Sequence, residues 1–164
     1  MQMIIFINGS INSGKTTVAR ILTKELADFA LVEIDALHEM ISWMPIDKAV
    51  PINLENAVSV IKNFTKRGLS VVVPYPLSQK NYDYIMGEIN DLDTKMHVFT
   101  LAPKLEKALT NRGTRELAEW ETDRIKHHYE IGIHAPNFGE VIDNSEQTPE
   151  ETAKIILDKI EDKK

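Results

Sequence analysis

Eight consecutive residues near the amino terminus constrain the fold of this chain more than any other part of its sequence. Residues 9–16 read GSINSGKT and match the pattern G-x-x-x-x-G-K-[ST] at every fixed position. An apolar run at 3–7 precedes them, and an amphipathic helical pattern follows at 14–27. Such a loop points successive backbone N–H groups at phosphate oxygens, and the next helix adds the positive end of its dipole. The sequence therefore predicts a strand, a loop and a helix that bind a nucleoside triphosphate.

The loop residues have distinct expected roles. Lys15 is expected to reach the β- and γ-phosphates, and the Thr16 hydroxyl to bind Mg²⁺. The predicted contacts of the triphosphate are Gly9, Ser10, Asn12, Ser13, Gly14, Lys15, Thr16 and Thr17. We therefore expect ATP and Mg²⁺ as cofactors. The guanine-recognition motif N-K-x-D is absent from the sequence, which favours a small kinase over a GTPase.

The rest of the chain alternates short β-type runs with amphipathic helical patterns. Strands are expected at 3–7, 30–34, 69–73, 96–101 and 140–142, and helices at 14–27, 54–66, 79–92, 116–129, from 103 and from 148. This alternation predicts an α/β fold of three layers, in which helices cover both faces of a five-stranded parallel sheet. Ligands bind beyond the carboxyl ends of the strands in such sheets.

Size and charge limit the remaining possibilities. The chain has 164 residues, which suits one domain, and it has no cysteine for disulfides or thiolate catalysis. Its apolar runs are far shorter than the roughly 18 residues of a membrane span, and no signal peptide is recognisable. We expect a cytoplasmic protein without membrane contact, either a monomer or a homodimer. The net charge of −6 disfavours nucleic acid as a partner.

Asp35 is the second informative residue, because it follows the expected strand 30–34. A carboxylate beside the phosphate site could accept the proton of an attacking hydroxyl, or hold a water bound to Mg²⁺. Alternatively, Asp35 is the N-cap of a helix, which is compatible with either role. We treat it as a candidate catalytic, metal-binding and substrate-binding residue.

Arg112 and Arg115 flank a glycine in an expected turn. Arginines in a flap over the nucleotide would neutralise the charge on a transferred phosphoryl group. The alternative is that both are solvated surface residues. We include both among the candidate catalytic residues, together with Lys15.

The sequence resembles the small P-loop kinases related to shikimate kinase, gluconate kinase, chloramphenicol phosphotransferase and the nucleoside monophosphate kinases. Residues 32–40, VEIDALHEM, look most like the segment of chloramphenicol phosphotransferase that carries its proposed base. The resemblance implies a P-loop NTPase fold with strand order 2-3-1-4-5. It also implies one kinase domain over residues 1–164, with a substrate-binding helical segment at about 36–66 and a lid at about 112–134.

The same resemblance assigns roles to individual residues. Asp35 takes the role of the base, and Arg112 and Arg115 those of the adenine-stacking and lid arginines. The loop 143–149 resembles the segment that flanks adenine, which adds Pro149 to the nucleotide site.

The segment expected to bind the acceptor departs from shikimate kinase. Residues 36–66 contain no arginine, and residues 74–76 read Pro-Tyr-Pro rather than a glycine pair. A carboxylate or phosphate acceptor would therefore lack a bidentate partner. Residues 33–61 contain five carboxylates and one lysine. We expect a neutral or cationic hydroxyl compound bound at Asp35, His38, Trp43 and Tyr75, unless Trp43 belongs to the core and the carboxylates are simply solvated.

These observations favour an ATP-dependent phosphotransferase that acts on a hydroxyl group of a small molecule such as an antibiotic or an aminosugar. The alternatives within the same class are a kinase of the shikimate or gluconate type and a nucleoside or nucleotide kinase. A kinase of nucleic-acid ends is disfavoured by the acidic charge. The alternative from another class is a regulatory ATPase whose product is a conformational change.

Overall fold

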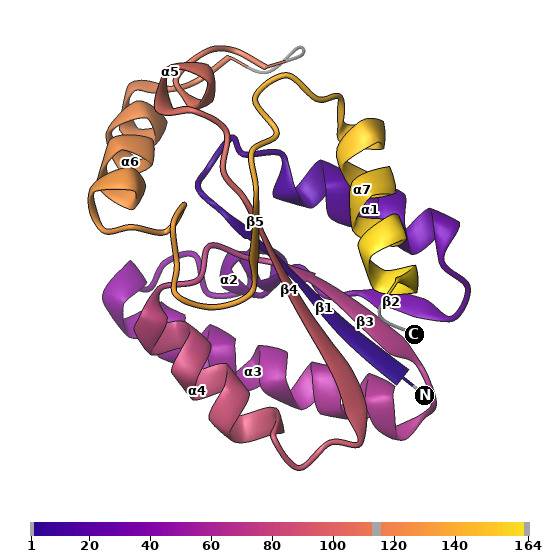
Figure 1. Ribbon diagram of the computed structural model, residues 1–164. Coiled ribbons are helices and arrows are strands. Elements are labelled where there is room, and N and C mark those ends of the chain that lie inside the picture. Colours follow the sequence, from indigo (N-terminus) through magenta and orange to yellow (C-terminus); the bar gives the residue numbers. More distant parts are fainter. Residues whose placement is uncertain (1, 113–115, 163–164) are drawn as a thin grey trace.

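The computed structural model describes residues 2–112 and 116–162, which form a parallel sheet covered by helices on both faces (Figure 1). The strands within these residues are β1 (Gln2–Gly9), β2 (Phe29–Leu31), β3 (Ser70–Pro74), β4 (Thr94–Leu101) and β5 (Glu140–Ile142). Their order is β2-β3-β1-β4-β5 and all pairs are parallel. The predicted fold class and strand order are thus confirmed.

The central strand, β1, explains why the apolar run near the amino terminus is continuous. Its residues Ile4, Ile5, Phe6 and Ile7 are fully buried, because helices cover both faces of the sheet at this point. β1 pairs with β3 on one side and with β4 on the other, so Ile5 lies beside Val72 and His97. The loop that follows β1 therefore leaves the middle of the sheet.

The helices are divided between the two faces of the sheet and its carboxyl edge. One apolar core includes residues of α1 (Lys15–Glu25) and α7 (Pro149–Glu161), and the other includes residues of α2 (Ile34–Glu39), α3 (Ile46–Lys66) and α4 (Gln79–Ile89). Figure 1 shows α5 (Leu105–Ala108) and α6 (Glu119–Glu130) beyond the carboxyl ends of the strands. The α6 helix and the segment around α5 therefore lie at the edge where ligands are expected.

Three predicted elements differ from the structure. The second strand ends at Leu31 rather than 34: the Val32 N–H still donates to the Val72 oxygen, but Glu33 is already the N-cap of α2. Asp35 therefore lies in the first turn of a helix and is not the cap. The helix expected at 54–66 begins at Ile46, since Pro51 is accommodated on its exposed side. The helix expected from 103 has only the four residues of α5, and Leu105 lies on its exposed side.

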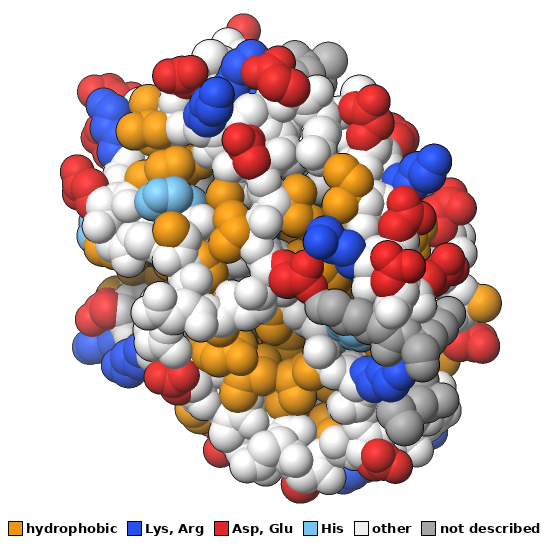
Figure 2. Space-filling view, viewed as in Figure 1, with side chains coloured by type: hydrophobic (Ala, Val, Ile, Leu, Met, Phe, Trp, Pro, Cys, Tyr) orange, Lys and Arg blue, Asp and Glu red, His pale blue; other side chains and the backbone are white. Residues whose placement is uncertain are grey.

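Charged side chains of both signs are interspersed on the face seen in Figure 2, where lysines and arginines lie scattered among carboxylates. A hollow lined by apolar side chains opens there between α4 and β4. It exists because β5 pairs only with the last residues of β4, from Phe99 to Leu101. Among the described residues, no helix combines the length and the apolar character needed to cross a membrane.

Candidate active site

The phosphate-binding loop joins β1 to α1 in the conformation that its glycines require. Gly14 is the N-cap of α1 and has φ 92°, a left-handed value that favours glycine. Asn12 is also left-handed, with φ 63°. The ammonium group of Lys15 donates a hydrogen bond of 3.0 Å to the backbone oxygen of Ser10, at the other end of the loop. Lys15 therefore lies over the inside of the loop, where the pattern predicts phosphate.

Distant segments hold this loop in place. The Asn12 side chain donates to the backbone oxygens of Ala108 and Thr110, at 2.8 and 2.9 Å. The Arg112 guanidinium donates in return to the backbone oxygen of Asn12, at 3.1 Å. Among the described residues, three hydrogen bonds that involve Asn12 thus fasten the end of α5 and the segment after it to the loop.

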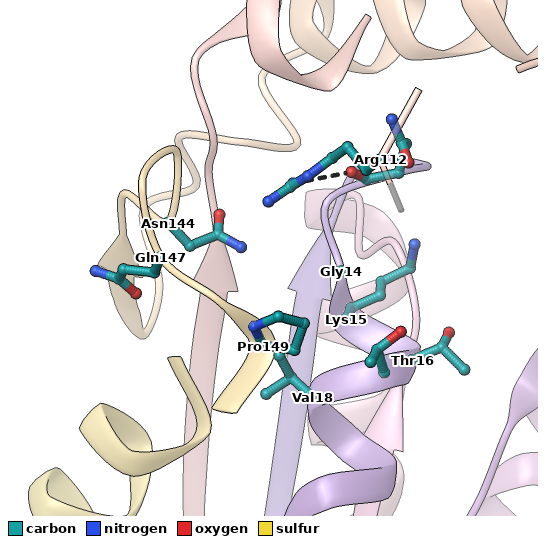
Figure 3. Close-up of a pocket in the computed structure, with 10 residues that line it drawn as sticks. Gly14, Lys15, Thr16, Val18, Arg112, Asn144, Gln147 and Pro149 are labelled. Carbon is teal, nitrogen blue, oxygen red and sulfur yellow. Dashed lines mark hydrogen bonds between the residues drawn. The ribbon is translucent and has the colours of Figure 1, made fainter. Parts of the chain in front are cut away.

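A cavity of 640 Å³ extends from this loop toward α7. The predicted residues that line it are Asn12, Gly14, Lys15, Thr16, Thr17, Arg112 and Pro149. Figure 3 shows Arg112 and Pro149 on different sides of this space, with Asn144 and Gln147 on its flank. Gly9, Ser10 and Ser13 are buried and form the body of the loop rather than the cavity wall. Arg115 lies outside the described residues.

Asn144 lines this cavity, and the sequence did not single it out from the rest of the loop 143–149. It is buried, and its amide nitrogen donates to the backbone oxygen of Ser13 at 2.9 Å. Its side-chain oxygen accepts no hydrogen bond within the described part of the chain. A buried acceptor on the wall of a cavity is suited to a hydrogen-bond donor of a ligand.

A second cavity, of 710 Å³, lies between α3, α4 and α6. Its wall is mainly apolar and aromatic, and it includes Val50, Leu54, Tyr75, Tyr84 and Ile133. Of the predicted substrate residues, only Tyr75 lines it. Trp43 lies on the segment between α2 and α3 with 78% of its surface exposed, so it belongs neither to this wall nor to the core. His38 shares a hydrogen bond of 2.8 Å with the buried Asn53.

Charged groups of both signs face this second cavity. Asp47 and Glu55 come from α3, Lys80 from α4 and Arg124 from α6. None of the four forms an ion pair with another of the described residues. The absence of arginine from residues 36–66 therefore does not leave the cavity without a cation, because the fold brings Arg124 to it from a later helix.

Tyr75 lines this cavity, and the charges of Asp35 and Arg124 both affect the pKa of its phenol. Burial, with a smaller contribution from the Asp35 carboxylate, raises the pKa of Tyr75 to about 12, and the Arg124 charge opposes the rise. The phenol is therefore protonated at neutral pH and can donate a hydrogen bond. The exposed Asp35 carboxylate and the Arg124 guanidinium thus both lie close enough to Tyr75 to affect its pKa.

Two buried polar residues that the sequence did not identify lie next to the phosphate-binding loop. His128, on α6, is buried and lines the second cavity. Asn8, at the end of β1, is fully buried: it donates to the Thr100 hydroxyl and the Ile133 oxygen and accepts from the Leu77 N–H at 2.7 Å. Asn8 could have been identified from the sequence, because it is a polar residue at the end of a buried apolar strand. It ties β1 to the segments that follow β3 and α6.

No group of three or more histidine or acidic side chains in the described ranges could hold a metal ion by itself. The Thr16 hydroxyl nevertheless lies on the wall of the first cavity, beside Lys15. Mg²⁺ usually retains several waters and takes few protein ligands when it accompanies substrate phosphates. This single oxygen therefore fits Mg²⁺ that arrives with a nucleotide.

The sheet, the phosphate-binding loop and the paired cavities define a P-loop phosphotransferase. The family model of chloramphenicol phosphotransferase-like proteins matches residues 2–161, and the chain belongs to this family. No curated protein sequence matches the chain.

Several solved structures share this fold but have low sequence identity to the chain. The APS kinase of Mycobacterium tuberculosis, in complex with AMPPNP and APS, has a TM-score of 0.73 at 17% identity, with 98% of each chain covered. A sugar kinase from Janibacter has a TM-score of 0.72 at 19% identity, covering 98% of this chain and 95% of that one. The tunicamycin resistance protein of Deinococcus radiodurans has 0.68 at 18%, covering 98% and 96%. At these identities the likeness shows the fold alone.

Proposed function

We propose that this protein transfers the γ-phosphoryl group of ATP to a hydroxyl group of a small molecule. The observation that carries the proposal is that the phosphate-binding loop lines a cavity of 640 Å³ and also bonds, through Ser10, to His128 on the wall of a second cavity of 710 Å³. One cavity holds the residues that suit a nucleotide, and the other is lined mainly by apolar and aromatic groups. A γ-phosphoryl group bound beside Ser10 would therefore lie close to the wall of the second cavity.

The nucleotide half of the proposal rests on the first cavity. Lys15 binds the β- and γ-phosphates, and Arg112 and Pro149 lie on opposite sides of the adenine ring. When Mg²⁺ is bound, the Thr16 hydroxyl holds it, and the ion neutralises phosphate charge. Arg112 is already directed by its bond to the Asn12 oxygen, so little ordering is required of it when ATP binds.

In the proposed transfer, the acceptor oxygen forms a bond to the γ-phosphorus while the bond from that phosphorus to the β,γ-bridging oxygen breaks. The hydroxyl proton passes to the Asp35 carboxylate, and ADP leaves with the bridging oxygen. Tyr75 stays protonated and orients the acceptor by a hydrogen bond. Asp35 is exposed, and its charge affects the pKa of Tyr75, which lines the acceptor cavity.

The second cavity suits an acceptor that is largely apolar and carries polar groups at its ends. The carboxylates Asp47 and Glu55 favour a cationic substituent, as the acidic sequence suggests, whereas Lys80 and Arg124 offer partners for an anionic or carbonyl group. An antibiotic with a free hydroxyl on a largely apolar body combines these features better than an aminosugar, which is polar throughout. The family to which the chain belongs supports an antibiotic-like acceptor, since its model is named for chloramphenicol phosphotransferase.

A panel of hydroxyl compounds with MgATP tests this function. The panel contains antibiotics, aminosugars, shikimate, gluconate and nucleosides, and the readouts are ADP release and product mass. We expect one chemical group of compounds to gain a phosphoryl group. ADP release without any phosphorylated product, over the whole panel, would instead favour the regulatory ATPase.

A further inference from the structure

His128 touches both halves of the site. It lies on α6 with 4% of its surface exposed, and its Nδ1 atom shares a hydrogen bond of 3.3 Å with the Ser10 hydroxyl on the phosphate-binding loop. The same imidazole forms part of the wall of the 710 Å³ cavity. Ser10 comes from the other end of the chain, so this contact exists only in the folded protein.

Ser10 marks one particular end of the loop. Its backbone oxygen accepts the hydrogen bond from the Lys15 ammonium, at 3.0 Å. Because the lysine of this loop reaches the β- and γ-phosphates, Ser10 lies near the γ end of a bound triphosphate. His128 therefore meets the loop at the end where the phosphoryl group leaves.

The position of His128 is itself well supported. The Tyr129 hydroxyl donates a hydrogen bond to the Pro103 backbone oxygen, and the Tyr129 ring stacks on His134 with centroids 4.3 Å apart. Just beyond the end of α6, the Ile133 backbone oxygen accepts a hydrogen bond of 3.3 Å from the Asn8 side chain. These contacts fix the carboxyl end of α6 against the ends of β1 and β4.

We propose that His128 is a positioning residue that connects the acceptor cavity to the γ-phosphate end of the phosphate-binding loop. Its hydrogen bond to Ser10 holds the loop in the shape that binds the γ-phosphate. Its ring, on the cavity wall, lies between this part of the loop and the acceptor. This inference rests on the proposed function, because it assumes that a triphosphate occupies the loop.

The charge state of the ring agrees with positioning rather than proton transfer. Burial is the largest cause, followed by the positive charges of Arg124, Lys15 and His127, and together they lower the pKa of His128 to about 4. A neutral imidazole has one donor and one acceptor nitrogen, so it can bond to Ser10 and to a ligand at once. Taking up the acceptor proton would place a further positive charge among these cations.

Calorimetric titration of the full chain with MgAMPPNP and with MgADP tests this role without a known acceptor. We expect His128→Ala to weaken MgAMPPNP binding about tenfold, the loss of a hydrogen bond that positions a charged group, and to leave MgADP binding within about twofold. Ser10→Ala should produce the same selective loss, and the double variant should lose no more than either single one. His127→Ala, on the exposed side of the same helix, is the matched control.

The conservative variant His128→Asn retains a polar atom near the position of Nδ1 and should restore most of the MgAMPPNP affinity. It also keeps the proposal testable if His128→Ala does not fold, as judged by circular dichroism. Equal losses for both nucleotides, or wild-type affinities in the His128 and Ser10 variants, would overturn the inference while leaving the proposed function intact. If the wild-type protein binds neither nucleotide, both proposals fail.

Discussion

The side-chain nitrogen of Asn144 lies 2.9 Å from the backbone oxygen of Ser13, to which it donates a hydrogen bond across 131 residues of sequence. Asn144 follows the last strand of the sheet, and Ser13 precedes the left-handed Gly14 at the start of α1. The edge of the sheet thus holds the turn of the phosphate-binding loop that leads into the helix.

Asn144→Ala should therefore weaken nucleotide binding as well as stability. The substitution leaves the Ser13 carbonyl without its donor, at a cost of about 1–3 kcal/mol in the free energy of unfolding. We expect MgADP and MgAMPPNP to lose affinity together, in contrast to the selective effect at His128. Urea unfolding and calorimetry provide the two measurements. Asn63→Ala, on the exposed side of α3, serves as the control, and wild-type values for both variants would contradict the role of Asn144.

Neighbouring atoms lie so close to Gly9 that they leave no room for a side chain. This gives a prediction about the first residue of the loop. A Cβ atom at Gly9 would lie 2.4 Å from the Ser13 hydroxyl and 2.8 Å from the Leu101 oxygen, and Gly9 has φ 151°. Gly9→Ala should destabilise the protein by about 1–3 kcal/mol, the usual cost of overpacking, and should impair nucleotide binding.

Gly87 offers a control with the same chemical change. It lies within α4, with no atom within 4 Å of an added Cβ. Gly87→Ala should therefore stabilise the protein by about 0.5–1 kcal/mol, because alanine is the better helix former. Thermal denaturation of the two variants should shift in opposite directions. An unchanged or higher midpoint for Gly9→Ala would show that the contacts around Gly9 do not determine its identity.

The parts of the site that lie within one segment were predictable from the sequence. The phosphate-binding loop is a contiguous pattern whose physics is local, and the Thr148–Glu151 capping box at the start of α7 is equally local. The sheet followed from the alternation of helical and strand patterns, and its order from the family resemblance.

The acceptor side was less predictable because its residues come together only in three dimensions. From the sequence, a cationic partner for the acceptor was sought only within residues 36–66, which contain no arginine. The second cavity instead receives Arg124 from α6. A signal for His128 did exist. Glu121, Ile125 and His128 have the spacing of one helix face, and all three are buried. A histidine on the buried face of an otherwise polar helix deserved consideration as a site residue.

Asp35→Asn tests the proposed base, because the amide has nearly the same shape but cannot accept the proton. We expect the affinity for MgATP to stay within about tenfold of wild type, and kcat for the acceptor identified by the panel to fall by about 10²-fold or more. Glu39→Gln, an exposed carboxylate on the same helix, is the matched control. If Asp35→Asn and Glu39→Gln have equal turnover, Asp35 does not receive the proton.

The lowered pKa of His128 predicts how stability depends on pH. As the pH falls below the ordinary histidine pKa of about 6.5, the unfolded side chain gains a proton while the folded one stays neutral down to about pH 4. The unfolded state then binds more protons, so the free energy of unfolding decreases. Between pH 7.5 and pH 5 the wild type should lose about 2 kcal/mol more than His128→Asn in urea titrations.

His127→Asn provides the control for this measurement, because His127 is exposed on the same helix. Its stability should follow the pH dependence of the wild type closely, because the His127 charge is the smallest of the causes that lower the pKa of His128. The same pH dependence in wild type and His128→Asn would mean that the His128 ring is not held neutral by its surroundings.

Transfer of labelled γ-phosphate from ATP to the acceptor found by the panel is the most direct test of the central claim. The wild-type protein should yield a labelled acceptor and one equivalent of ADP for each phosphoryl group transferred. Lys15→Ala should give neither product while retaining the wild-type circular dichroism spectrum, whereas Lys24→Ala, exposed on the same helix, should be fully active. Label released only as inorganic phosphate, or undiminished transfer by Lys15→Ala, would contradict the account.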